Sequence, residues 1–201
     1  MTVENDAALL LAHLDSIGVD GSEQVARGWN HIGAVLVDAA LQRQRNYARV
    51  VEPRVRLIKD TWPDADTTSG FLKRMDNEDL ARTIKWNGPS RIRQIEQVAD
   101  VLSKHDVETV GDFRAGLENG GLRTALKRVK YVGPKTLDYL EILVGISSVA
   151  VDSRILKITR AAGMTSTSYD HIAEVIRAAA DQRGWRHGDL DAALWRAGED
   201  L

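Results

Sequence analysis

The chain has 201 residues, long enough for one full-sized domain that buries ~70% of the surface of its unfolded form. Hydrophobic residues make up 43% and charged residues 28%, with 16 Gly and 4 Pro, which excludes disordered, collagen-like and low-complexity chains. The absence of cysteine excludes a disulfide, a thiolate nucleophile, a cysteine-ligated zinc and a cysteine-held iron–sulfur cluster.

The net charge of -2 conceals an uneven distribution of charge along the chain. Two segments are basic, 41–60 with +4 and 121–160 with +5, and the segments 1–40, 61–120 and 161–201 are acidic. If the two basic segments meet in space, they form a cationic surface for a polyanion. If they do not, each is a solvated helix face, and the charge pattern alone leaves both interpretations open.

Nearly every segment has the helical period and none alternates with period two, so the sequence predicts an all-α, multi-helix bundle. The first predicted helix ends at Gly18. A second is predicted to be capped by Ser22, to break near Gly33 and to continue into the basic segment 41–47.

Two short helices are predicted to be capped by Thr68 and by Asn77. The clearest amphipathic helix is predicted to be capped by Ser90, after Pro89 has ended the preceding element. Its apolar stripe consists of Ile92, Ile95, Val98, Ala99 and Leu102.

A turn at Gly111 is predicted to open another short helix, and the last two are predicted to be capped by Ser168 and Asp189 and to end at Gly184 and Gly198. About ten helices result, with no linker long enough to separate independent domains. We therefore expect one domain over 1–201, with lobes at 30–145 and at 1–29 plus 146–201.

Between residues 121 and 145 the pattern predicts two helices joined by a tight hairpin. An apolar stripe from Leu122 to Val129 must end by Gly133-Pro134, because proline disfavours helix in the residue before it. Pro134 suits the first turn of a new helix, whose unpaired N–H groups and dipole attract a phosphate. Basic side chains surround this bend: Arg123, Lys127, Arg128, Lys130 and Lys135.

Two short motifs carry a family resemblance. The stretch Val-Gly-Pro-Lys-Thr (132–136) precedes Val-Asp-Ser-Arg-Ile (151–155), and in this order and spacing the sequence resembles the helix-hairpin-helix DNA glycosylase superfamily, the endonuclease III-like group. The resemblance covers about 30–198 and is strong over 122–163. It implies an all-α helix-hairpin-helix fold and removal of a damaged, modified or mispaired base in base excision repair.

The resemblance also implies roles for individual residues. Asp152 corresponds to the family's catalytic carboxylate and Lys135 to the nucleophilic lysine of members that also have abasic-site lyase activity. Tyr131 replaces the first glycine of the family's hairpin, and Arg154 replaces the histidine after the catalytic aspartate. The Leu-x-x-Gln segment that ends at Gln44 is similar to the family's helix that fills the gap left by the extruded base.

We accordingly expect DNA contacts from one set of residues: Gln44, Arg45, Lys130, Tyr131, Val132, Gly133 and Arg154. Trp86, beside Asn87-Gly88, is the tryptophan expected to line a base pocket. Each residue also has a plainer interpretation. Asp152 is a helix cap, Lys135 a phosphate contact, and Gln44 an ordinary solvated side chain.

The five histidines have no metal-ligand spacing, so we expect no catalytic metal and no cofactor, although the hairpin leaves room for a monovalent cation. The partner is expected to be DNA, in duplex form, bound by a monomer in the cytoplasm at the nucleoid, with no membrane segment. The alternatives are a monofunctional glycosylase that uses an activated water, a non-catalytic helix-hairpin-helix DNA-binding protein, and a helical protein-interaction scaffold.

Overall fold

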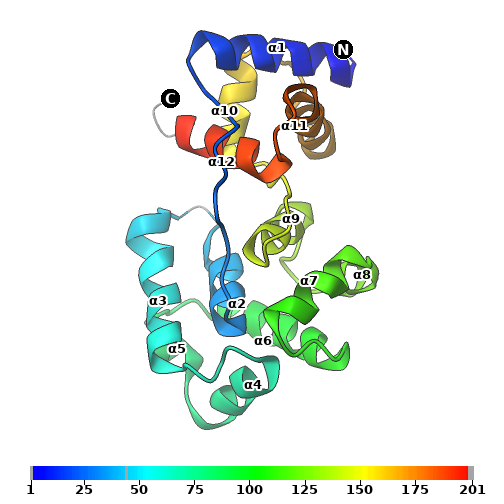
Figure 1. Ribbon diagram of the computed structural model, residues 1–201. Coiled ribbons are helices and arrows are strands. Elements are labelled where there is room, and N and C mark those ends of the chain that lie inside the picture. The colour runs from blue at the N-terminus through cyan, green and yellow to red at the C-terminus, as the bar shows by residue number, and fades with distance from the viewer. Residues whose placement is uncertain (1, 44, 199–201) are drawn as a thin grey trace. The chain divides into compact units, whose positions relative to one another are not determined.

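The computed structural model describes residues 2–43 and 45–198 (Figure 1). All regular secondary structure in these ranges is helical, which confirms the predicted all-α class. The same residues include no helix with the length and apolar character needed to cross a membrane. The chain divides into two compact units, and each is described separately. The terminal unit comprises Met1–Ala26 and Ile146–Leu201, and the central unit comprises Arg27–Gly145.

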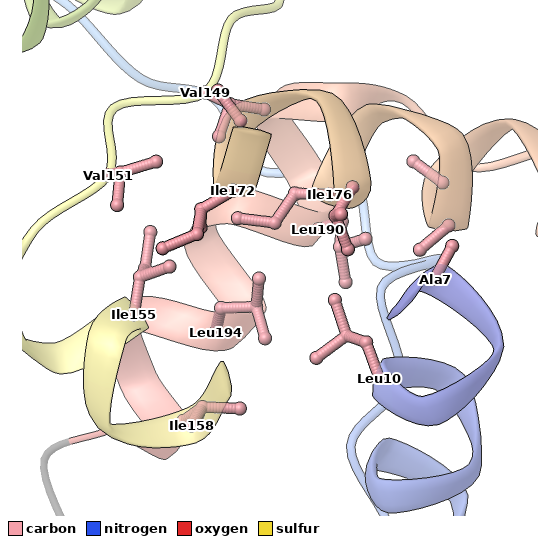
Figure 2. Packing of buried hydrophobic residues seen from close by; sticks show 14 of the residues in the cluster. Ala7, Leu10, Val149, Val151, Ile155, Ile158, Ile172, Ile176, Leu190 and Leu194 are labelled. Carbon is pink, nitrogen blue, oxygen red and sulfur yellow. The ribbon is translucent and has the colours of Figure 1, made fainter. Parts of the chain in front are cut away.

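The terminal unit is a four-helix assembly. Its helices are α1 (Val3–Ser16), α10 (Ser153–Ala161), α11 (Tyr169–Arg183) and α12 (His187–Ala197). Helix α11 packs on α1 and α12, and α12 packs on α10. Figure 2 shows that Leu10, Ile158, Ile176 and Leu194, one from each helix, point into a common apolar core. Burial of such side chains is the main stabilising term for a unit of this kind.

Two buried aspartates of α12 fix extended segments of the terminal unit. Asp189 Oδ1 accepts from the backbone N–H of Val25 at 3.0 Å, and Asp191 Oδ1 accepts from that of Ala150 at 2.9 Å. Both carboxylates are almost fully buried. The first bond holds the connection after α1 against α12 and the second holds the segment before α10 there, because an unpaired buried N–H would be costly.

The central unit surrounds helix α2, which packs against α3, α4, α6, α9 and η1. Its elements are α2 (Ile32–Leu41), the π-helical turn η1 (Tyr47–Val51), α3 (Glu52–Thr61), α4 (Thr68–Asn77), α5 (Leu80–Thr83), α6 (Pro89–Lys104), α7 (Val110–Glu118), α8 (Gly121–Leu126) and α9 (Pro134–Leu143). The apolar side of α2 is buried along its whole length, which explains its central position.

The helix predicted from Ser22 is wrong, because residues 19–31 form an extended connection instead. Gly28 has φ +105°, and any Cβ there would overlap the carbonyl oxygen of Leu143. The N–H of Trp29 donates to the same oxygen at 3.0 Å. Helix α2 begins only at Ile32, where the His31 side chain caps it by accepting from the Ala34 N–H at 3.1 Å.

Several other predicted boundaries were also displaced. The basic segment 41–47 does not continue α2, which ends at Leu41, and the next helical element starts at Tyr47. Helix α6 begins at Pro89 behind Gly88, so Pro89 starts this helix instead of ending the previous element. Four further helices are capped by a residue other than the predicted one. Thr67 caps α4 in place of Thr68, and Asp79 caps α5 in place of Asn77. Thr109 caps α7, where a turn at Gly111 was expected, and Arg186 caps α12 in place of Asp189.

A buried carboxylate joins the centre of the central unit. Asp38 of α2 is fully buried and accepts from Trp29 Nε1 at 2.8 Å, Tyr47 Oη at 3.0 Å and Tyr139 Oη at 2.9 Å. Burial raises the pKa of Asp38, and the three donors oppose that rise. The three donors come from the connection before α2, from η1 and from α9, so one side chain ties all of these to α2.

Candidate functional site

Helices α8 and α9 flank a seven-residue loop, 127–133, at the position where the sequence predicts a hairpin. Val129 and Val132 are buried and anchor the loop, and the side chains of Lys127, Arg128 and Lys130 are exposed. Pro134 is the first residue of α9, as predicted. No atom lies within 4 Å of where a Cβ on Gly133 would be, so the backbone at the start of α9 is open to an approaching group.

Tyr131 has the left-handed backbone conformation that favours glycine, with φ +72°. It stands at the position where the resembled family has a glycine, so the backbone keeps a glycine-like conformation at a cost of ~1 kcal/mol. Its ring is 45% exposed, the ammonium of Lys130 lies 5.1 Å from the ring centroid, and the guanidinium of Arg91 lies 5.8 Å from it. The exposed ring of Tyr131 therefore lies close to two cationic side chains, Lys130 of the loop and Arg91 of α6.

Arg91 of α6 links the two basic segments of the sequence. It contacts the ring of Tyr131 from the second segment, and the positive charges of Arg43 and Arg45 from the first lie close enough to affect its ionisation. Burial lowers the pKa of Arg91, and those two arginines lower it further. Arg43, Arg45, Arg91 and Lys130 form no ion pair within residues 2–43 and 45–198, and we call them, with Tyr131, the cationic face.

Arg123 does not belong to the cationic face, although it lies in the basic stretch of the sequence. Its guanidinium forms ion pairs with Asp138, at 2.5 Å, and with Glu141, both on α9. The Asp138 side chain is 4% exposed. Arg123 is therefore a structural tie between α8 and α9, and the carboxylates neutralise the charge that the sequence analysis assigned to phosphate binding.

Trp86 lies between two arginines at the edge of a large hollow. The guanidinium of Arg45 is 5.7 Å from its ring centroid and that of Arg54 is 5.4 Å from it. The hollow has a volume of about 730 Å³ and is lined by Asp79, Ala81, Arg82, Lys85, Trp86, Asn87, Pro89, Ile92, Arg93 and Glu96. Trp86 Nε1 is buried without a hydrogen-bond partner. Gln44 lies outside the described residues.

Asp152 caps α10 in the terminal unit. Its Oδ1 accepts from the backbone N–H groups of Arg154 at 2.9 Å and Ile155 at 3.0 Å, and the side chain is half-buried. Both N–H groups donate to Oδ1, and neither donates to Oδ2. The helix-cap interpretation of Asp152 is thereby confirmed, and it does not conflict with a catalytic role.

Arg154 is held by α12. Its guanidinium lies 4.0 Å from the ring centroid of Trp195 and donates to the Trp195 carbonyl at 3.5 Å. A Cβ on Gly198 would come within 2.7 Å of Arg154 Cβ, so the two helices approach here as closely as a glycine allows. Arg154 therefore helps to position the start of α10, where Asp152 lies.

Lys135 is the second residue of α9 and is half-buried. It belongs to the central unit and Asp152 to the terminal unit. Among the predicted DNA contacts, the structure brings Lys130 and Tyr131 together with Arg91, and Arg45 together with Trp86. Arg91 is not among the predicted DNA contacts, because only the packing of α6 against α8 places its helix beside the 127–133 loop.

The described residues contain no group of three histidine, cysteine, aspartate or glutamate side chains that could hold a metal ion. A monovalent cation at the 127–133 loop stays a prediction. The carbonyl of Val129 already accepts from the Val132 N–H at 3.1 Å.

The fold and this arrangement define the class of the protein as an all-α chain with an unpaired cationic face on one unit and a capped, half-buried carboxylate on the other. The chain belongs to the family described as "Domain of unknown function (DUF8548)", whose model matches residues 20–199. No curated protein matches it.

Proposed function

We propose that the protein is a DNA glycosylase that removes a damaged, modified or mispaired base. The observation that carries this proposal is the cationic face, in which Arg91 contacts Tyr131 of the second basic segment and lies near Arg43 and Arg45 of the first. Cations without acidic partners are suited to displacing the counterions of a phosphate backbone. The motifs 132–136 and 151–155, in the order and spacing of the resembled family, supply the chemical part of the proposal.

Breaking the bond between a base and its sugar builds positive charge at the sugar carbon C1′. An ionised carboxylate near that carbon stabilises the transition state. Asp152 suits this role because two backbone N–H groups bind its Oδ1 and so fix the direction of the carboxylate. Oδ2 is then the oxygen that faces the sugar.

Lys135 is the proposed nucleophile. Its amine forms a bond to C1′ as the bond from C1′ to the base breaks, and the base leaves with the bonding electrons and takes up a proton. Loss of protons from nitrogen and opening of the sugar ring give a Schiff base, from which the strand is cleaved by elimination. In a monofunctional enzyme a water activated by Asp152 attacks instead, and Lys135 contacts a phosphate.

The extruded base needs a stacking partner, and the gap in the duplex needs a filler. Trp86 is the proposed stacking residue because it lines the largest hollow described above, beside the cationic side chains of Arg82, Lys85 and Arg93. Gln44 is the proposed filler by resemblance.

Borohydride trapping on duplexes with a panel of damaged, modified and mispaired bases tests the proposal. Borohydride reduces the Schiff base to a stable adduct, which we expect with the parent protein and not with Lys135→Ala. Lys127→Ala, an exposed lysine of the same loop, is the control that keeps the adduct. Base release without an adduct would establish the monofunctional mechanism.

Asp152→Asn separates chemistry from binding. Asparagine also caps helices well, so α10 is expected to remain folded. We expect base release to fall at least about a hundredfold with little change in DNA affinity. Asp170→Asn, an exposed acid in the first turn of α11, is the control with full activity. If the parent protein binds DNA in a salt-dependent way but releases no base from any lesion, it is a non-catalytic DNA-binding protein. If it has no salt-dependent affinity for DNA, both the glycosylase and the DNA-binding interpretations are wrong.

A further inference from the structure

A second, smaller cavity lies between α6 and the 127–133 loop. It has a volume of about 150 Å³ and is lined by Ser90, Arg93, Gln94, Gln97, Lys130 and Tyr131. On the same measure one water needs only about 10–15 Å³, so the cavity has room for a larger group. Four of these residues belong to α6, and their spacing of three, one and three positions places them on one face of that helix: Ser90, Arg93, Gln94 and Gln97. The loop forms the opposite wall.

Gln94 gives this cavity its chemical character. The side chain is only 3% exposed, and its Oε1 accepts from Arg91 Nη1 at 2.8 Å. This bond fixes the amide orientation, because a flipped amide would set its own N–H groups against those of the guanidinium. The two N–H donors on Nε2 have no protein partner within residues 2–43 and 45–198. Nε2 is not among the fully buried polar atoms without a partner, and Gln94 lines the cavity, so these donors are open to a ligand there.

The rest of the lining also consists of donors. Lys130 and Arg93 bring positive charge and Ser90 a hydroxyl group, and none of the lining residues is acidic. Such a cavity favours a ligand that is negatively charged and rich in acceptors, and a phosphate group meets both requirements.

We infer that this cavity binds one phosphodiester group of a DNA strand, in addition to any phosphate held by the loop backbone; the inference rests on the proposed function. Two observations favour a strand over a free phosphate ion. Lys130 and Tyr131 belong both to the cavity and to the cationic face, so the positive surface continues beyond the cavity. The exposed ring of Tyr131 adds a surface on which a sugar or base can pack.

Three variants test the inference by equilibrium binding of duplex DNA over a range of salt concentrations. Gln94→Glu keeps an acceptor for Arg91 but replaces the free donors with negative charge. Arg93→Ala and Lys130→Ala each remove one cation. We expect each to weaken binding by roughly tenfold, the effect of losing one charge-assisted hydrogen bond. Lys104→Ala, which removes an exposed cation at the far end of α6, is the control with less than about a twofold effect.

The salt dependence provides a sharper criterion. Each phosphate contact adds about 0.9 to the slope of log affinity against log salt concentration. If Arg93 and Lys130 hold the same phosphate, the double variant loses about 0.9 in slope in total, because only one phosphate contact disappears. A loss of about 1.8 would mean two separate phosphates and would overturn the inference.

The side-chain amide signal of Gln94 in a ¹H–¹⁵N NMR spectrum, assigned by its loss in Gln94→Glu, reports on the cavity directly. We expect the dinucleotide dTpT, which has one phosphodiester, to shift this signal more than inorganic phosphate at equal concentration. A larger shift with inorganic phosphate would assign the cavity to a free ion and overturn the inference.

The two proposals fail in different ways. If the parent protein releases bases and Arg93→Ala and Gln94→Glu keep its affinity and salt slope, only the inference about the cavity is wrong. If the parent has no salt-dependent affinity for DNA, the proposed function is wrong, and so is the assignment of the cavity to a DNA strand.

Discussion

The two units differ in how they use charge. The central unit has 20 Lys and Arg against 16 Asp and Glu, a net charge of +4, and the terminal unit has 7 against 13, a net charge of -6. In the terminal unit, Asp152, Asp189 and Asp191 accept from backbone N–H groups and fix the chain. In the central unit, the cationic face lacks acidic partners. Under the proposed function, the terminal unit positions the carboxylate and the central unit binds the DNA.

Gly28→Ala should have the largest effect and should damage only the central unit. The new side chain would combine a strained φ of +105° with overlap of the Leu143 carbonyl. We expect a loss of about 4 kcal/mol in the free energy of unfolding. Urea denaturation followed by ¹⁹F NMR of fluorotryptophan separates the units, since Trp29, Trp62 and Trp86 report on the central one.

Gly120→Ala is the matched control in the same unit. Gly120 also has a positive φ, +78°, but nothing lies within 4 Å of the position of a Cβ. We expect a cost of only about 1 kcal/mol, from backbone strain alone. Equal costs for the two variants would show that the contact with Leu143 does not matter.

Arg123→Met should destabilise the central unit next most strongly. It removes one ion-pair partner of Asp138, whose side chain is 4% exposed, and should cost about 3 kcal/mol in the free energy of unfolding. Arg196→Met breaks the exposed pair with Glu23 in the terminal unit and should cost less than about 1 kcal/mol. If Arg123→Met keeps the fold and lowers DNA affinity as much as Lys130→Ala does, Arg123 contacts DNA, and its assignment as a structural tie is wrong.

The outcomes for Gly28 and Arg123 also show what could be predicted from the sequence. The all-α class, the start of α9 at Pro134 and the cap at Asp152 follow from local rules about proline and capping side chains. The extended connection over 19–31 does not, because its apolar spacing resembles a helix, and contacts with Leu143 and Asp189, distant in sequence, hold it extended. The pairing of Arg123 and the position of Arg91 likewise depend on helix packing that no local pattern encodes.

Gly198→Ala tests the terminal unit. The added Cβ would press on the backbone of Arg154, whose N–H donates to Asp152, and should cost about 2 kcal/mol in the free energy of unfolding. Because the carboxylate is displaced, base release should fall more than DNA affinity. Gly188→Ala in the same helix is the control, since its nearest contact would be an ordinary 3.4 Å. Equal activity of the two variants would contradict the role given to this close approach.

His31 should make the central unit the more acid-sensitive of the two. Burial lowers the pKa of His31, so below its ordinary value of 6.5 the unfolded chain binds a proton that the folded chain does not. Stability should therefore fall as pH drops through 6.5. His31→Asn keeps a capping side chain, should cost about 1 kcal/mol at pH 7.5, and should flatten this pH dependence. Urea titrations at pH 7.5 and 5.5 measure it, and an unchanged pH dependence in the variant would exclude His31 as the cause.

The contacts of Asp38 have a consequence for how the central unit opens. Asp38 ties α2 to α9, to η1 and to the connection at Trp29, so none of these can detach without removing a hydrogen-bond donor from a buried carboxyl group. Their backbone amides should therefore exchange with deuterium as one cooperative group, at a shared rate slower than that of the amides in the 127–133 loop.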